Sequence, residues 1–331
     1  MPVPVIILFA PTASGKTALA LNLFGKSSHS FFKDRAELIS ADSMQVYRNL
    51  DIGTAKPSEQ EKSELTHHLV DIRNPDQQFT VADFVCEADR ACRDIYSRGK
   101  IPLVAGGTGF YIRSFIMGLP VTPESDPLVR EKIKNRLEAE GNEALYRELS
   151  SIDPVSAEKI NVNDSYRICR ALEIYYTAGK PKSFFELNSV PRKEYEFCTI
   201  ILERDRDELY ERINRRVDLM FEQGLEGEVR SLISGGCTAS MPGMQAIGYR
   251  EWFSNDFNTP EGLEKIRHEI KRNSRKYAKK QYTYMHDIPG ASVVQLSPDS
   301  DGIAETSGII LKFLEKFYSK SLDRSSDLDN N

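Results

Sequence analysis

Apolar residues in this chain follow two kinds of pattern that alternate along most of its length. Short, nearly continuous apolar runs predict buried strands, and longer segments with apolar residues every three or four positions predict helices with one buried face. The predicted strands are 3–10, 37–41, 68–72, 101–105, 197–202 and 292–296, and the predicted helices include 18–24, 81–98, 205–221, 225–233, 259–286 and 303–317. This alternation favours an α/β fold with a doubly wound parallel sheet, in which ligands bind beyond the carboxyl ends of the strands.

The pattern changes after Pro120, where helical spacing replaces the strand pattern up to residue 191. Asp126 followed by Pro127 predicts a helix start, because an aspartate can cap the first turn and proline is tolerated there. We therefore expect an α/β core in two parts, 1–120 and 192–318, interrupted by a helical insertion domain at 121–191. The polar tail, 319–331, is short of core residues and is expected to be disordered.

Composition and charge are those of a globular protein, and they limit how it could bind nucleic acid and where in the cell it could act. The 331 residues are 40% apolar and 28% charged, and the net charge is −5. Any nucleic-acid binding must therefore come from a local basic patch. No apolar run approaches the length of a membrane span, and residues 3–10 lack the basic lead and cleavage site of a signal peptide. The five cysteines contain no Cys-x-x-Cys pair, which favours a reduced, cytoplasmic protein. We expect the protein to be a monomer.

Segment 10–17, with the sequence APTASGKT, lies between the first predicted strand and the first predicted helix. This context predicts a phosphate-binding loop, whose backbone N–H groups and helix N-terminus face a phosphate, and hence a P-loop-type core. In such a loop Lys16 places a charge on the terminal phosphate and Thr17 holds magnesium. Ala10 stands where the pattern has glycine, which costs little at negative φ and about 1 kcal/mol at positive φ.

Two further strand ends should meet this loop at one edge of the sheet. Asp42 follows the second predicted strand, where a carboxylate can bind magnesium, accept a proton from a nucleophile, or simply cap a turn. Gly106, Gly107 and Thr108 follow the fourth strand, and glycines there let the backbone approach a ligand. That strand does not end in the aspartate that ATPases and GTPases use for magnesium, which disfavours nucleotide hydrolysis.

Two sets of basic residues are candidates for contact with nucleic acid. Arg167 and Arg170 lie on one face of a helix whose first turn Asn163 or Asp164 can cap. The two arginines could bind a phosphate backbone, or they could simply be exposed to solvent. The helix 259–286 carries a denser set over its apolar stripe: Lys265, Arg267, His268, Lys271, Arg272, Arg275, Lys276, Lys279 and Lys280. Because nearly all charges on this helix are positive although the whole chain is net acidic, an RNA-facing surface is favoured over a merely solvated face.

Two features, a pair of tyrosines and a pair of histidines, allow two interpretations each. Tyr282 and Tyr284 at the end of the basic helix can stack on bases, although core packing is the commoner fate of such residues. The pair His67 and His68 resembles a metal cue, but no Cys/His set accompanies it, so a structural role is expected.

Taken in order, these segments resemble the tRNA dimethylallyltransferase family, also called tRNA isopentenyltransferases. The motifs that carry the resemblance are 10–17 (APTASGKT), 39–47 (ISADSMQVY), 51–57 (DIGTAKP), 67–71 (HHLVD), 106–111 (GGTGFY), Asn163-Asp164 with Arg167 and Arg170, and 245–250 (QAIGYR). They extend over residues 5–284. Because no zinc-finger spacing follows them, the chain is similar to the bacterial form.

The resemblance implies a prenyl transfer that depends on Mg²⁺. The donor is dimethylallyl diphosphate, and the acceptor is the exocyclic amine of the adenosine 3′ of the anticodon, flipped out of the anticodon stem-loop of a tRNA. The residues implied to hold the diphosphate are Thr12, Ala13, Ser14, Gly15, Lys16 and Thr17, with Thr17 on the metal. The residues implied to be catalytic are Asp42, Thr108 and Lys16, with Asp42 orienting the amine and accepting its proton.

The resemblance also places the contacts with tRNA. Carried over position by position, they fall on Asp42, Ser43, Met44, Gln45, Thr108, Arg130, Tyr166, Arg167, Ile168, Cys169, Arg170, Gln245, Ala246, Ile247, Gly248, Tyr249 and Arg250. Arg212 and Arg216 stand where the family has basic residues near the active site.

Two rival activities and one non-catalytic alternative stay open on the sequence. The non-catalytic alternative, an RNA-binding protein, would have no use for Lys16 and Thr17 in register. An enzyme that prenylates free adenine nucleotides, as in cytokinin synthesis, shares the phosphate loop, but the helical insertion and the basic helix favour tRNA. A P-loop kinase for a small metabolite would need a nucleotide-base site, and no segment predicts one.

Overall fold

The chain forms two compact units in the computed structural model, which describes residues 2–119, 122–123, 126–185 and 190–328, with side chains as far as 319. One unit comprises Met1–Ile116 with Arg192–Asn331, and the other is Met117–Pro191. The second unit spans nearly the same residues as the predicted insertion at 121–191; Pro120 and Val121, where that insertion should begin, lie outside the described residues.

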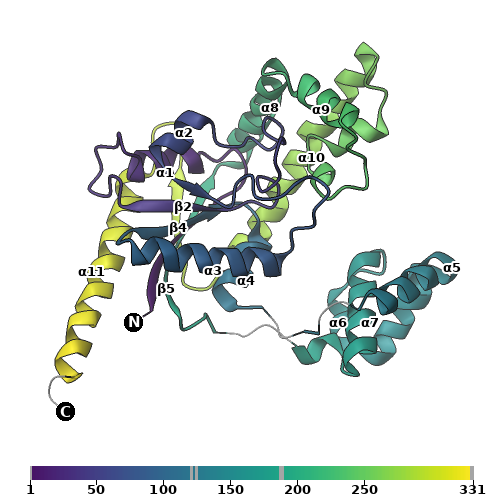
Figure 1. The fold of residues 1–331 in the computed structure, drawn as a ribbon, viewed down its shortest axis with the longest axis horizontal. Coiled ribbons are helices and arrows are strands. Elements are labelled where there is room, and N and C mark those ends of the chain that lie inside the picture. Colours follow the sequence, from purple (N-terminus) through teal and green to yellow (C-terminus); the bar gives the residue numbers. More distant parts are fainter. Residues whose placement is uncertain (1, 120–121, 124–125, 186–189, 329–331) are drawn as a thin grey trace. The chain divides into compact units, whose positions relative to one another are not determined.

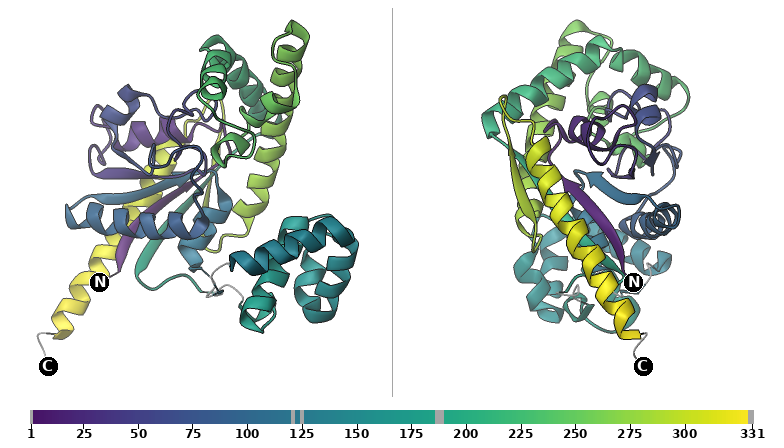
Figure 2. Two further views of the ribbon diagram at one scale, coloured as in Figure 1. Left: turned by 45° about the vertical axis from the view of Figure 1, so that its right-hand side comes forward. Right: turned by 90° about the vertical axis from the view of Figure 1, so that its left-hand side faces the viewer.

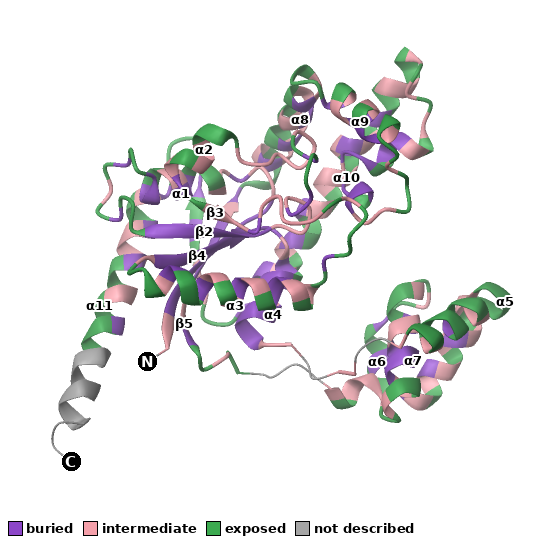
Figure 3. Ribbon diagram, viewed as in Figure 1, coloured by how far each residue is buried: buried purple, intermediate pink, exposed green. Residues whose placement is uncertain are grey.

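The first unit is built on a six-stranded sheet in the order β3-β2-β4-β1-β5-β6, with every neighbouring pair parallel. The strands are β1 (Val3–Phe9), β2 (Ala36–Ala41), β3 (His67–His68), β4 (Ile101–Gly106), β5 (Tyr195–Arg204) and β6 (Ser292–Leu296). Figure 3 shows β2 and β4 buried along their length, as expected for a parallel sheet covered on both faces. The predicted doubly wound parallel sheet is confirmed.

One predicted strand is much shorter than its apolar pattern indicates. The pattern favours a strand over 68–72, but β3 ends at His68, and Leu69 and Asp71 have positive φ values of 64° and 58°. Those backbone conformations turn the chain away from the sheet edge, so the apolar residues after His68 belong to a loop.

Helices cover both faces of the sheet (Figure 1). On one face α1 (Lys16–Phe24) and α11 (Ile303–Leu328) pack on β1 and its neighbours through a cluster that includes Leu8, Leu23 and Ile310. On the other face α3 (Val81–Ser97) and α4 (Gly109–Met117) pack together, with the rings of Phe84 and Tyr111 stacked. The short helix α2 (Glu59–Glu64) precedes β3. No described helix is long and apolar enough to cross a membrane.

A second group of helices lies beyond the carboxyl ends of the central strands (Figures 1 and 2). It contains α8 (Arg206–Glu222), α9 (Leu225–Ser234), α10 (Pro260–His286) and the single turns η2 (Gly243–Gln245) and η3 (Arg250–Ser254). Helix α10 packs on α8 through buried Ile213 and Ala278. Because ligands of parallel sheets bind at this edge, the group is placed to wall a site there.

The second unit is helical, as the sequence predicts. It contains α5 (Pro127–Ile152), α6 (Pro154–Lys159), α7 (Ser165–Ala178) and the turn η1 (Lys182–Phe185), around a core that includes Leu145 and Leu172. Asp126 caps α5, accepting from the N–H groups of Leu128 and Val129, which confirms the predicted start of that helix. Gly141, at φ 79°, breaks α5 into two helical segments.

The last helix runs further than predicted. Its apolar pattern ends near Phe317, and the polar residues from 319 onward are expected to be disordered, but α11 continues to Leu328. Neither glycine nor proline interrupts 319–328, so nothing in the backbone ends the helix once it has begun. Residues 329–331 lie outside the described residues.

Candidate active site

The phosphate-loop segment has the backbone that its motif predicts. It follows β1 and ends in α1, whose first turn begins at Lys16 after Gly15 in the left-handed region, at φ 106°. Ala10 is fully buried, its N–H donates to the Gly106 carbonyl at 3.2 Å, and it is not among the residues with positive φ. Replacing the usual glycine with alanine therefore costs little here. The strained non-glycine residue is Ala13, at φ 63°.

Three arginines and a glutamine hold this loop from outside. Arg216 donates to Thr12 Oγ1 at 2.8 Å, and Gln281 Oε1 accepts from the Thr12 N–H at 3.0 Å. Arg212 donates to the Ala13 carbonyl at 2.9 Å, and Arg204 to the Ser14 carbonyl at 3.1 Å. Arg212 and Arg204 thus engage two of the loop's carbonyls, and Gln281 engages the Thr12 N–H, so an anion must use N–H groups later in the loop.

Lys16 carries its charge inside a cavity. Burial lowers the pKa of its ammonium group from 10.5 to about 8; the negative charge of Asp42 opposes that shift and the positive charge of Arg216 adds to it. Burial also lowers the pKa of Arg216, against the effect of Asp42. Two desolvated cations beside one loop are costly without a partner, which makes this end of the cavity suited to a highly charged anion.

Asp42 closes a turn directly after β2. Its Oδ1 accepts from the N–H groups of Met44 at 2.9 Å and Gln45 at 3.3 Å, so the turn-capping interpretation is correct for one oxygen. Within the described residues Oδ2 accepts no hydrogen bond. Thr108 stands beside this turn, its Oγ1 accepting from the Ser43 N–H at 3.1 Å. One carboxylate oxygen therefore holds the turn and the other is left for a ligand.

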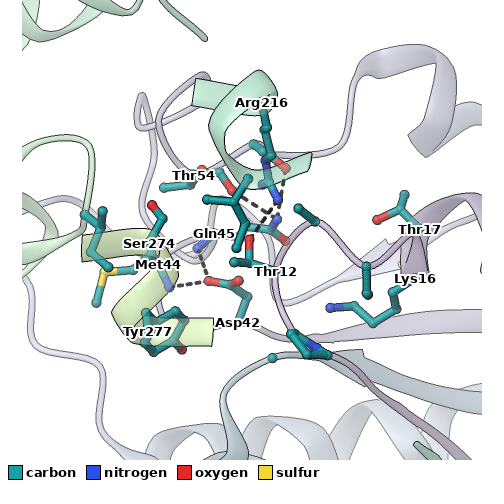
Figure 4. A pocket seen from close by; sticks show the side chains of 18 of the residues that line it. Thr12, Lys16, Thr17, Asp42, Met44, Gln45, Thr54, Arg216, Ser274 and Tyr277 are labelled. Atoms are coloured by element: carbon teal, nitrogen blue, oxygen red, sulfur yellow. Dashed lines mark hydrogen bonds between the residues drawn. The ribbon is translucent and has the colours of Figure 1, made fainter. Parts of the chain in front are cut away.

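These residues line a cavity of about 640 Å³. Figure 4 shows Asp42 in its middle, with Lys16 and Thr17 toward one end and Met44, Ser274 and Tyr277 toward the other. Met44 and Tyr277 give the second end an apolar character, and the cavity wall also contains Met220, Ile247 and Ile270. Burial raises the pKa of the Tyr277 phenol to about 12, and the charge of Asp42 adds to that shift. The cavity thus joins a cationic, phosphate-binding end to an apolar end past a carboxylate.

The glycines after β4 lie where other parts of the protein come close. A Cβ on Gly106 would lie 2.1 Å from the Ala41 carbonyl oxygen, and one on Gly107 would lie 2.2 Å from Gln281 Nε2. A Cβ on Gly109 would lie 2.4 Å from Tyr284. Glycine is required at these positions because neighbouring protein atoms come close. Gly106 and Gly107 also line the cavity, so the expected ligand approach at these two glycines stays a prediction.

Segment 245–250 divides between the cavity wall and its support. Gln245, Ala246, Ile247 and Arg250 line the cavity, whereas Gly248 and Tyr249 are buried behind them. The Tyr249 hydroxyl donates to Glu228 at 2.6 Å and accepts from the Gly53 N–H at 3.0 Å. Tyr249 therefore supports the 51–57 loop and presents no surface to tRNA.

Gln45, also predicted to contact tRNA, has its side chain engaged within the protein. Its Oε1 accepts from Ser40 Oγ at 3.0 Å and its Nε2 donates to the Ala55 carbonyl at 3.1 Å. Those bonds join the Asp42 turn to the 51–57 loop over the cavity.

The basic residues of α10 divide into two groups. Arg267 and Lys271 face α8, where both approach Asp218, at 3.8 and 2.6 Å, and Arg275 donates to Asn214. Those residues hold the helix pair together. The exposed basic row, which we define as Lys265, His268, Arg272, Lys276 and Lys279, follows helical spacing along one face. Lys280 is exposed as well, so this row and Lys280 keep the predicted RNA-facing role.

The remaining predicted tRNA contacts belong to the helical unit. Arg130 and Arg170 both approach the buried Glu173 carboxylate, at 3.7 and 3.0 Å, and Arg167 pairs with the helix cap Asp164 at 2.7 Å. Tyr166 is 79% exposed.

Two neighbours of these arginines are less accessible. Ile168 is fully buried in the core of the unit, so its side chain cannot reach a ligand, and Cys169 is half-buried. The arginines and Tyr166 therefore remain the candidates within this segment.

Other side chains settle into structural positions. Tyr282 donates to the Arg204 carbonyl at 3.0 Å and packs near Leu209. His67 Nδ1 bonds the Leu65 carbonyl at 2.6 Å, and His68 Nε2 bonds Glu37 at 2.8 Å. No group of three or more His, Cys, Asp or Glu side chains within the described residues is arranged to hold a metal ion.

The sequence did not identify Arg204, Gln281 or Tyr277 as residues of the site. A signal for Gln281 was present: it continues the buried stripe of Ile266, Ile270 and Ala278 on a strongly amphipathic helix, where a polar residue needs a partner. Arg204 ends β5, at the edge of the sheet where ligands bind.

Comparisons with known proteins agree on one family. The profile of a family described as "IPP transferase" matches residues 45–287. A "tRNA dimethylallyltransferase 1" from Trichlorobacter lovleyi is 41% identical over 300 residues, covering 89% of this chain and 95% of that protein. The crystal structure of a full-length tRNA isopentenylpyrophosphate transferase from Bacillus halodurans is 35% identical and aligns with a TM-score of 0.66 over 96% of this chain and 99% of that one.

A eukaryotic dimethylallyltransferase, described as acting on tRNA, aligns with a higher TM-score of 0.79. Its sequence is 28% identical to this one. The alignment covers 96% of this chain and 80% of that protein.

Proposed function

The chain belongs to the IPP transferase family, and from that premise we propose that it transfers a dimethylallyl group from dimethylallyl diphosphate to tRNA. The acceptor we propose is the exocyclic amine of the adenosine 3′ of the anticodon. Membership confirms the resemblance that the sequence motifs indicated, and it confirms the choice of a transferase over a non-catalytic RNA-binding protein.

The observation that carries this proposal is the order of groups along one cavity. Lys16 and the free N–H groups of the phosphate loop lie at one end, Asp42 stands in the middle, and an apolar end follows. A diphosphate suits the cationic end and a flat base suits the apolar end. Asp42 Oδ2 then faces the junction between donor and acceptor.

The transfer breaks the bond between the allylic carbon and the diphosphate oxygen, and it forms a bond between that carbon and the adenine amine. The diphosphate leaves with the electron pair, and Lys16, Arg216 and the loop N–H groups stabilise its growing negative charge. The amine gives up one proton, which Asp42 Oδ2 accepts. Thr108, bonded to the Ser43 N–H, holds the Asp42 turn in place during that step.

We further propose a magnesium ion at this site, held by Thr17 with diphosphate oxygens. The donor chemistry fits, because the Thr17 hydroxyl and diphosphate oxygens are the hard oxygen ligands that Mg²⁺ prefers. The buried Ser14 hydroxyl, which has no hydrogen-bond partner within the described residues, supports a polar occupant beside them. When bound, the ion would neutralise part of the charge on the leaving diphosphate.

All five cysteines are free thiols, which supports a reduced, cytoplasmic setting for the protein. The monomeric state stays a prediction.

A competition assay tests the proposed activity. Labelled dimethylallyl diphosphate and magnesium are offered with unmodified tRNA in one tube, and with AMP or ATP in another. The proposal expects label only in tRNA, at the adenosine beside the anticodon. Label in the free nucleotide would instead identify the cytokinin-type activity, and ATP consumption without label transfer would identify a kinase.

The pKa of Lys16 gives the reaction a defined dependence on pH. Because burial lowers that pKa to about 8, the free enzyme loses the Lys16 charge as the pH rises through 8. We expect kcat/KM for the donor to fall about tenfold per pH unit above that value. The maximal rate should fall only at higher pH, since bound diphosphate stabilises the protonated amine.

The pH profile distinguishes this effect from unfolding. The folded-state pKa of Lys16 lies below its unfolded value of 10.5, so the contribution of this group to folding stability increases between pH 8 and 10.5. A melting temperature measured at each pH provides the control. A flat kcat/KM profile up to pH 9.5 would show that Lys16 does not titrate in the free enzyme.

Neutralising part of the exposed basic row should weaken tRNA binding in a salt-dependent way. With Arg272, Lys276 and Lys279 changed to glutamine, we expect the slope of log affinity against log salt to become shallower by about 2, since each phosphate contact contributes 0.7–0.9. The matched control changes Lys26, Lys33 and Lys62 to glutamine, with the same change in net charge. Equal slopes in the two triple variants would contradict an RNA-facing role for the row.

A further inference from the structure

Gln281 joins the two loops that carry the reacting groups. It lies on α10 and is 3% exposed, and both ends of its amide are bonded to backbone. Its Oε1 accepts from the Thr12 N–H at 3.0 Å, and its Nε2 donates to the Gly107 carbonyl at 2.7 Å. Thr12 follows β1 and Gly107 follows β4, which are neighbouring strands of the sheet. One side chain therefore spans the carboxyl ends of two adjacent strands.

The space at Gly107 is shaped around this amide. A Cβ on Gly107 would lie 2.2 Å from Gln281 Nε2 and 3.2 Å from the Ala10 carbonyl oxygen. Any larger residue at 107 would displace the amide and break its bond to the backbone. Gly107 is therefore matched to Gln281, which explains a glycine that the sequence attributes to a ligand.

The connection reaches the reacting groups at both ends. On one side Thr12 begins the turn that leads to Lys16, and its N–H is taken by Gln281, so a diphosphate must use later N–H groups of the loop. On the other side Gly107 precedes Thr108, whose Oγ1 accepts from Ser43 beside Asp42. The chain of bonds runs from the phosphate loop through Gln281 to the Asp42 turn.

We propose that Gln281 is a positioning residue for prenyl transfer, which fixes the spacing between the phosphate loop and the Asp42 turn. The inference rests on the proposed function. Gln281 acts through its two backbone bonds, and it contributes no proton and no charge to the reaction. Reacting atoms must approach to near contact distance, and a displacement of about 1 Å costs about 100-fold in rate.

A neutral amide suits this role because it donates and accepts at the same time. An ionised carboxylate in its place accepts from Thr12 but cannot donate to the Gly107 carbonyl, and a thioether does neither. The variants Gln281→Glu and Gln281→Met therefore remove one bond and both bonds from side chains of similar length.

The first test measures single-turnover transfer to tRNA together with the affinity for each substrate. We expect Gln281→Met to slow transfer about 10- to 100-fold, while donor and tRNA affinities change little. Thr283→Val, an exposed polar-to-apolar change on the same helix, should behave as wild type. Transfer by Gln281→Met at the wild-type rate would overturn the proposal.

The pH dependence of the transfer rate tests the positioning role, because it would not change if Gln281 were merely structural. The ratio of Gln281→Glu to wild-type rates should rise as the pH falls, because a protonated carboxyl regains a donor for the Gly107 carbonyl. A constant ratio from pH 5 to 8 would count against the role of that donated bond.

A pair of variants separates an effect of Gln281 on positioning from an effect on folding. The same pair tests the proposal if Gln281→Met does not fold. Gly107→Ala should lower the melting temperature and the rate, because its Cβ meets the amide. Adding Gln281→Ala relieves that contact, so the melting temperature should recover in part, since the Thr12 N–H and the Gly107 carbonyl stay unpaired, while transfer stays slow. Recovery of both would show that Gln281 only packs.

Failure of the proposed function looks different from failure of this inference. If the wild-type protein transfers no label to any acceptor, the activity is wrong. If wild type transfers label and every Gln281 variant matches it, only the positioning role is wrong.

Discussion

Asparagine in place of Asp42 should lower the rate of prenyl transfer by about 10²- to 10⁴-fold, the usual contribution of a positioned general base. The amide cannot accept the proton that leaves the adenine amine. Its oxygen can still accept from the N–H groups of Met44 and Gln45, so the turn after β2 is kept. Affinities for donor and tRNA should therefore change little, and the loss should appear in the rate of the bound complex.

The measurement is a single-turnover assay with both substrates bound. Asp207→Asn, the same chemical change on a side chain that is 85% exposed, is the matched control and should leave the rate unchanged. Asp42→Ala should be slower than Asp42→Asn and less stable, because alanine also removes both bonds within the turn. If Asp42→Asn transferred at the wild-type rate, another group would have to accept the proton.

Local sequence signals predicted those parts of the fold that depend on neighbouring residues. The phosphate loop follows a buried strand and opens a helix, and that context fixes Lys16 and Thr17 in register. The buried runs on β2, β4 and β5 have no polar alternation, which indicated a sheet covered on both faces. Asp42 was identified by its place at a strand end.

What the sequence could not show depends on contacts between distant segments. Gln281 meets Thr12 across 269 residues, and no local pattern reveals that bond. Arg275 was grouped with the RNA-facing residues, but its partner Asn214 lies on another helix. Likewise, no local pattern shows that a side chain at position 107 would meet Gln281. Helix α11 shows the complementary limit, since polarity alone does not end a helix.

The same contacts explain why loop and helix residues separate into two roles. Residues of the phosphate loop and the Asp42 turn face the cavity, whereas Arg204 and Tyr249 hold neighbouring segments from behind and Gln281 does so from the cavity wall. The supporting residues come from β5, α10 and the 245–250 segment, far along the chain. The first part of the core therefore supplies the phosphate loop and the Asp42 turn, and the second part supplies the residues that hold them in place.

Methionine in place of Lys16 should lower kcat/KM for the donor by about 10²- to 10³-fold, the range seen when one group that stabilises a developing anion is removed. Unlike the Asp42 variants, this variant should lose affinity for the donor as well as rate, because Lys16 attracts diphosphate before and during bond breaking. Arg216 and the loop N–H groups remain, so some transfer should persist. Affinity for tRNA should be unchanged.

The stability of the same variant gives an independent check. Burial lowers the pKa of Lys16, which means that the folded protein carries a desolvated charge at a cost below pH 8. Removing that charge should therefore raise the melting temperature at pH 7 while activity falls, as expected where an active site trades stability for function. Lys33→Met, the same change at an exposed position, should alter neither property. A lower melting temperature together with lost activity would point to damage to the loop, and unchanged donor affinity would show that Lys16 does not bind the diphosphate.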